Sequence, residues 1–72
     1  MASNRMTGQY RRLTGVLRIA GHSPMLETGD DRILRLITSE DLAAYDGGMV
    51  IVEGNVKGLD RLQVEWIGRP AS

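Results

Sequence analysis

The chain contains short stretches in which apolar and polar residues alternate, the period of two that a half-buried β-strand shows. The first stretch covers residues 10–20, and Leu13, Leu17 and Ile19 set its apolar parity. Gly15 falls in the middle of that parity, where glycine weakens a flat strand but suits a sharp bend or a bulge. We therefore expect a long first strand that bends around its central glycine.

Four further stretches predict strands over residues 24–28, 32–37, 49–57 and 61–67. Glycine-containing segments at residues 21–24, 29–31 and 57–60 separate consecutive strands and are typical of turns. Ile67 breaks the alternation of the last stretch, so we expect a bulge or a change of face there. On the last three of these strands, the side chains expected to face the core of the domain are Leu34, Leu36, Val50, Val52, Val56, Leu62 and Val64.

The periodicity changes between the third and fourth stretches, where residues 39–45 predict a helix of about two turns. Thr38 and Ser39 offer capping hydroxyls, and acidic residues follow in the first turn. Leu42 and Tyr45 are three residues apart and would share the buried face of this helix. Gly47 would end it, because glycine accepts the left-handed conformation that closes a helix.

Composition makes the expected core small and aliphatic. The 72 residues include no phenylalanine, two tyrosines and one tryptophan. A chain of this length forms one domain and buries only about 60% of its unfolded surface, so such domains usually need additional stabilisation. The absence of cysteine excludes disulfides, thiolate metal sites and thiol nucleophiles. Barrel closure and a homodimer remain as candidate sources of stability.

The predicted order of three strands, a helix and two strands resembles the five-stranded oligonucleotide/oligosaccharide-binding (OB) barrel. The first strand of such domains, with its central glycine, is similar to Leu13-Thr14-Gly15-Val16-Leu17. The fourth and fifth strands are similar to Val50-Ile51-Val52-Glu53-Gly54 and Leu62-Gln63-Val64-Glu65-Trp66-Ile67. The resemblance covers residues 10–68 and extends to short uncharacterised OB-like proteins of bacteria.

This resemblance implies a mainly β fold, a small OB-type barrel over residues 9–68 with one short helix between strands 3 and 4. The helix would plug one end of the barrel, whereas an SH3-like barrel lacks a helix at that place. Residues 1–8 and 69–72 are expected to be frayed ends. Met1 and Met6 both remain open as the native start.

Charge does not single out a partner. Nine Lys and Arg residues balance nine Asp and Glu residues, unlike the basic balance of dedicated nucleic-acid binders. Residues 1–26 hold four arginines and no acid, and residues 27–72 hold five bases and nine acids. A mixed solvated surface is favoured over a basic stripe. With no apolar run of about 18 residues and no signal segment, we expect no membrane partner and a cytoplasmic location.

No motif supports catalysis, and we expect a non-enzymatic protein without a cofactor or a metal. His22 and Ser23 are adjacent on a turn, where a base and a nucleophile rarely reach the required geometry. The acidic residues Glu27, Asp30 and Asp31 favour a solvated turn over a cation site, because the calcium-loop spacing is missing.

Binding is the better-supported class. OB domains that hold single strands use the face of strands 2 and 3 and the flanking loops. Such sites also present aromatic platforms, which strands 2 and 3 lack here, and Trp66 is expected to pack in the core or at its rim. The resemblance thus implies weak, salt-sensitive binding of single-stranded nucleic acid. The candidate nucleic-acid-binding residues are Arg18, His22, Arg32, Arg35, Lys57 and Arg61.

Association with another protein or with a second copy of the chain is the alternative function. Ile33, Met49 and Ile51 fall on the outward parity of their strands, and an exposed apolar patch usually marks an interface. Strand parity shifts at every bulge. Coverage of one of these residues by the helix or a loop therefore stays equally open.

Overall fold

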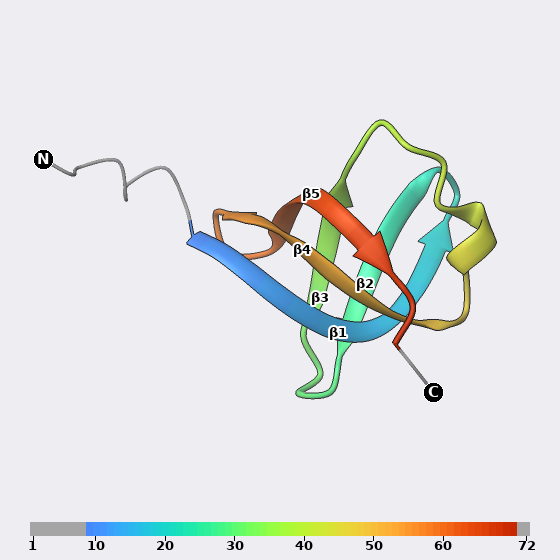
Figure 1. Ribbon diagram of the computed structural model, residues 1–72, viewed down its shortest axis with the longest axis horizontal. Coiled ribbons are helices and arrows are strands. Elements are labelled where there is room, and N and C mark those ends of the chain that lie inside the picture. Colours follow the sequence, from blue (N-terminus) through green and yellow to red (C-terminus); the bar gives the residue numbers. More distant parts are fainter. Residues whose placement is uncertain (1–8, 71–72) are drawn as a thin grey trace, which may run out of the picture.

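The computed structural model describes residues 9–70, which form a closed barrel of five strands (Figure 1). The strands are β1 (Gln9–Ala20), β2 (Ser23–Thr28), β3 (Ile33–Ile37), β4 (Met49–Lys57) and β5 (Arg61–Gly68), and the 3₁₀ turn η2 (Ala43–Tyr45) lies between β3 and β4. The order around the barrel is β1-β2-β3-β5-β4, with β3 and β5 parallel and the other pairs antiparallel. The predicted fold class is confirmed. Of the expected frayed ends, residues 1–8 and 71–72 lie outside the described part.

β1 closes the barrel because its two halves pair with different strands. The half from Gln9 to Val16 pairs with β4, and the half from Gly15 to Ala20 pairs with β2. At Gly15, a β-carbon would collide with the carbonyl oxygen of Glu27, so only glycine lets the two backbones approach this closely. β1 is strongly curved in Figure 1, as its central glycine predicts.

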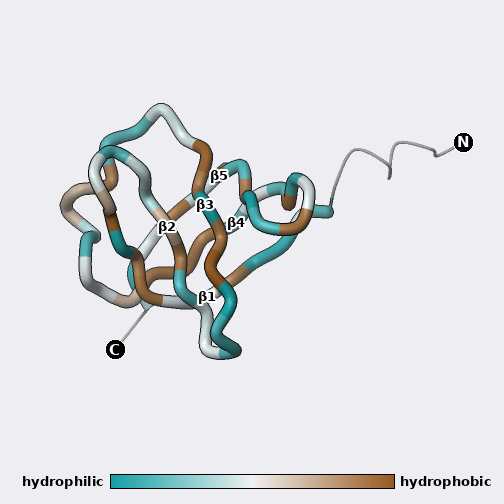
Figure 2. The backbone as a smooth tube through the Cα atoms, turned by 180° about the vertical axis from the view of Figure 1, so that it is seen from behind, coloured by the Kyte–Doolittle hydropathy of each residue, from teal (hydrophilic) through white to brown (hydrophobic). Residues whose placement is uncertain are grey.

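Aliphatic side chains from every strand fill the barrel. Figure 2 shows apolar residues concentrated on the strands and mostly polar residues in the connecting loops. The inward parity predicted for β3, β4 and β5 is confirmed, with Val56 and Val64 partly buried against the core. The buried core consists of Leu17, Leu26, Leu34, Leu36, Leu42, Val50, Val52 and Leu62.

A bulge in β5 explains why Ile67 breaks the alternation. The register between β4 and β5 shifts between Glu53 and Gly54, whose partners are Trp66 and Val64, so Glu65 is the extra residue. Past this point the parity of β5 inverts. Ile67 then packs against the core and Trp66 faces outward. The predicted change of face is therefore present.

The predicted two-turn helix over residues 39–45 is wrong in its extent, because only the single turn η2 is helical. Polar side chains compete with the helix for its backbone groups: Thr38 Oγ1 accepts a hydrogen bond from the Glu40 amide, and Asp41 Oδ1 accepts one from the Ala43 amide. Leu42 nevertheless plugs the barrel as expected, with 3% of its surface exposed. Tyr45 packs beside the core three residues later.

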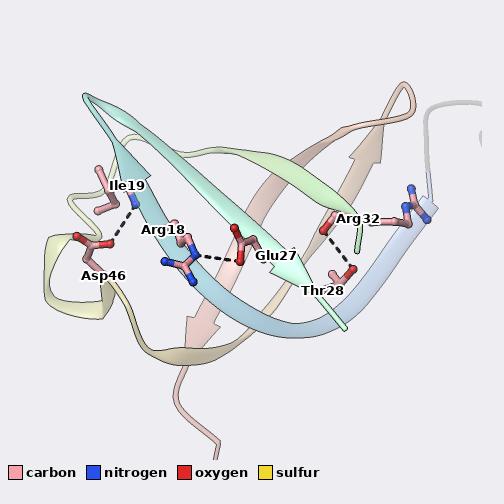
Figure 3. A network of polar contacts seen from close by, with 6 residues as sticks. All are labelled: Arg18, Ile19, Glu27, Thr28, Arg32 and Asp46. Carbon is pink, nitrogen blue, oxygen red and sulfur yellow. Dashed lines mark hydrogen bonds and ion pairs between the residues drawn. The ribbon is translucent and has the colours of Figure 1, made fainter. Parts of the chain in front are cut away.

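Hydrogen bonds hold residues 46–48, which follow the plug residue Leu42 and the turn η2, to the second half of β1. The Leu17 amide donates to the Gly48 carbonyl at 2.9 Å, and the Gly47 amide donates to the Leu17 carbonyl at 2.7 Å. Asp46 Oδ1 accepts from the Ile19 amide at 3.0 Å (Figure 3). The plug thus closes one end of the barrel, remote from the β4–β5 loop (Figure 1).

Candidate nucleic-acid interface

Cationic residues form a line across the outer surface of the barrel. Arg18 on β1 is the register partner of Met25 on β2, which pairs in turn with Arg35 on β3. Arg35 lies beside Arg61 on β5, and Arg61 pairs with Lys57 on β4. Each of these side chains points outward, because its neighbour in sequence belongs to the core or packs against it.

Part of this line, together with Arg32 from the turn between β2 and β3, lies around the β4–β5 loop, residues 58–60. Arg32 Nη2 donates a hydrogen bond to the Leu59 carbonyl at 3.2 Å. The Arg35 amide donates to the Asp60 carbonyl at 2.8 Å. Nη2 of Arg61 lies 3.5 Å from the position of a β-carbon on Gly58. We call Arg32, Arg35, Lys57 and Arg61 the cationic cluster.

The side chains of the cationic cluster take part in no ion pair among the described residues, although the Asp30 carboxylate lies near enough to Arg32 to interact with its charge. The only acid within the loop itself is Asp60. Several like charges around one short loop raise the local potential and attract anions. The arrangement suits a chain of phosphates better than a single ion, because the charges are spread over three strands and a loop.

Arg18 and His22 stand apart from the cationic cluster. Nε of Arg18 lies 2.9 Å from Glu27 Oε1, and this ion pair offsets its charge (Figure 3). His22 lies on the β1–β2 turn, beside a hollow that Glu40, Asp41 and Leu42 also line. That hollow belongs to the plugged end of the barrel. The structure therefore brings together four of the candidate nucleic-acid-binding residues and separates the other two.

The candidate interface residues divide into two groups. Met49 and Ile51 both point outward from β4, whereas Ile33 on β3 is separated from Met49 by Glu27 and Val16 on the intervening strands. Ile33 and Met49 are exposed, whereas Ile51 is half-buried. Ile33 does not belong to a common patch with the other two.

Trp66 extends the group formed by Met49 and Ile51. Gly68 is the register partner of Ile51, and the Trp66 ring covers Gly68, where a β-carbon would meet the ring at 2.5 Å. Met49 is 50% exposed and Trp66 49% exposed. We call Met49, Ile51 and Trp66 the apolar face. Sequence reasoning missed Trp66, and the broken parity at Ile67 is the signal that could have revealed its outward position.

Among residues 9–70, no three His, Asp or Glu side chains gather closely enough to hold an ion. Residues 9–70 contain no helix that could span a membrane.

The described residues thus form a small closed β-barrel with a cluster of cations on its surface. It belongs to the family described as "Protein of unknown function (DUF5818)", whose model matches residues 14–70. That match runs from the middle of β1 past the end of β5 and so covers nearly the whole barrel. No curated protein and no solved structure matches the chain.

Proposed function

We propose that this protein is a non-enzymatic OB-type binding module that binds single-stranded nucleic acid weakly through its cationic cluster. The OB assignment is supported by the barrel order, the parallel pairing of β3 with β5 and the turn η2 between β3 and β4. The function rests on one observation, the convergence of Arg32, Arg35, Lys57 and Arg61 on the β4–β5 loop.

The cationic cluster would bind the sugar–phosphate backbone, so its binding would depend little on the nucleotide sequence. Arginine and lysine side chains neutralise phosphates and release counterions, which makes the affinity fall steeply with salt. The outward positions of β2 and β3 hold Met25, Glu27, Ile33, Arg35 and Ile37, so these two strands lack an aromatic platform. Since stacking contributes about 1–3 kcal/mol per base at other single-strand sites, we expect weak binding.

An NMR titration with a short single-stranded oligonucleotide at low salt tests this function. The amide resonances of Arg35, Lys57 and Arg61 should move and should recover when salt is added. His22 serves as an internal control, because it lies at the plugged end of the barrel. Unmoved cluster resonances at low salt would rule the function out.

The apolar face supports a second candidate function, association with a protein partner or with a second copy of the chain. An exposed cluster of large apolar side chains usually marks an interface, and tryptophan is enriched at such sites. Sedimentation equilibrium should give a concentration-dependent mass that Ile51→Lys abolishes. Ile33→Lys is the matched control, because Ile33 is exposed but lies outside the apolar face. Equal masses for the wild type and Ile51→Lys would count against this candidate.

A further inference from the structure

The end of the barrel opposite the plug contains a hollow, which we call the mouth hollow. Its volume is about 240 Å³. Its floor consists of Leu13, Leu34 and Val56, which are buried or packed against the core. Its rim consists of exposed residues, among them Asp30 and Arg32. An apolar floor beneath a rim with a few polar groups is the usual construction of a small-ligand site.

The mouth hollow is continuous with the cationic cluster. Gly58 and Leu59 of the β4–β5 loop line it, and this is the loop on which the cluster converges. Arg32 belongs to both, since its guanidinium bonds the Leu59 carbonyl at 3.2 Å. A strand whose phosphates lie on the cluster would therefore pass directly over the opening of the hollow.

The size and lining of the mouth hollow suit a flat ring with a polar edge. Sites for drug-sized ligands usually measure about 300–1,000 Å³, so this hollow takes a smaller group. Leu59 is 87% exposed and stands beside the opening, where its side chain could cover one face of such a ring. The rim offers a hydrogen-bond acceptor, Asp30, together with a donor, Arg32.

Asp30 is held as an ionised acceptor. Thr28 Oγ1 donates a hydrogen bond to Asp30 Oδ1, and this bond lowers the pKa of the Asp30 carboxyl below its usual value. The carboxylate repels phosphate but accepts hydrogen bonds from ring N–H and amino groups. This side of the rim thus favours the edge of a base over the backbone that carries it.

We propose that the mouth hollow accepts one unpaired base of the strand whose backbone lies on the cationic cluster. This inference rests on the proposed function, because the cluster delivers the strand to the opening. The apolar floor and Leu59 would take the place of the aromatic platform that β2 and β3 lack. Binding would then combine a salt-dependent backbone contact with a salt-independent contact to a single base.

Two probes of equal length separate the two contacts: a DNA hexamer, and a hexamer of the same backbone without bases. Both should move the amide resonances of Arg35 and Arg61 at low salt. Only the hexamer with bases should move the methyl resonances of Leu13, Leu34 and Val56. The inference would be overturned, and the proposed function left intact, if both probes moved the amide resonances of the cluster but neither moved the methyl resonances of the hollow. If neither probe moved the amide resonances of the cluster, both the inference and the proposed function would be overturned.

A substitution at the rim gives an independent test. Leu59→Ala should weaken binding of the hexamer about fivefold, the loss expected from about 40 Å² of apolar contact, and leave binding of the base-free chain unchanged. Leu59 is solvent-exposed, so its truncation should not disturb the fold. Met49→Ala, an exposed apolar residue on the apolar face, is the matched control and should change neither affinity. An unchanged hexamer affinity for Leu59→Ala would contradict a base in the mouth hollow.

Discussion

Truncating the plug residue, Leu42→Ala, should cost this domain a large part of its stability. Leu42 is 3% exposed and caps the barrel interior. Buried Leu→Ala changes cost about 2–5 kcal/mol, and a site at the end of a barrel partly collapses, so we expect about 2.5 kcal/mol. A domain of this length has a free energy of unfolding of only about 4–11 kcal/mol.

Urea unfolding followed by circular dichroism measures this loss. With an m-value of about 1 kcal/mol/M, the midpoint should fall by about 2.5 M while the slope stays constant. Leu59→Ala removes the same atoms from a side chain that is 87% exposed and should cost less than about 0.5 kcal/mol. Equal midpoints for the two variants would refute the role of Leu42 as a plug.

Two further predictions concern the barrel wall. Gly54→Ala should destabilise the protein by about 3 kcal/mol, because its β-carbon would collide with the Gln63 carbonyl oxygen at the bulge; Gly29→Ala, with open space around it, should be nearly neutral in the same urea titration. The hydrogen bond from Tyr10 to Glu53 raises the pKa of Tyr10 above its ordinary value of 10.0. The contribution of this hydrogen bond to the free energy of unfolding is therefore complete below pH 10.0. It is lost as the pH rises through the pKa of Tyr10 in the folded state. Tyr10→Phe should remove this alkaline loss of stability, and a loss of equal size in the variant would contradict the assignment.

The strands were predictable because each has a period of two that the barrel preserves. Leu34 and Leu36 face the core as their alternation predicts, and Gly15 sits where β1 bends past β2. The bulge in β5 is also indicated by the sequence, because Ile67, just after the bulge, breaks the alternation of apolar and polar residues. Local patterning thus determines which side of each strand is buried.

The plug was harder to predict because two opposing preferences act on residues 38–45. Hydroxyl and carboxyl groups at Thr38 and Asp41 resemble helix caps, but both bond the backbone two residues ahead and favour turns. Only three residues, Ala43–Tyr45, remain helical. The burial of Leu42 is nevertheless predicted correctly, because packing against the end of the barrel removes its apolar side chain from water whether or not the backbone is helical.

The candidate site depends on contacts that no local pattern encodes. Arg35 and Arg61 become neighbours only through the parallel register of β3 and β5, which barrel closure imposes on residues far apart in sequence. His22 is a candidate through the resemblance to OB barrels but lies at the plugged end of the barrel, because β1 runs the length of the barrel before its turn. Trp66 joins the apolar face only after the bulge inverts β5.

The salt dependence of oligonucleotide affinity tests the central claim, that the cationic cluster binds a single strand. Four cations on single-stranded phosphates predict a slope of log affinity against log salt of about −2.8. In the double variant Arg35→Gln/Arg61→Gln, the magnitude of this slope should fall to about 1.4. Arg12→Gln/Arg18→Gln removes two arginines that are ion-paired with Glu53 and Glu27 and should keep the wild-type slope. Equal slopes for the wild type and the Arg35→Gln/Arg61→Gln variant would contradict the account.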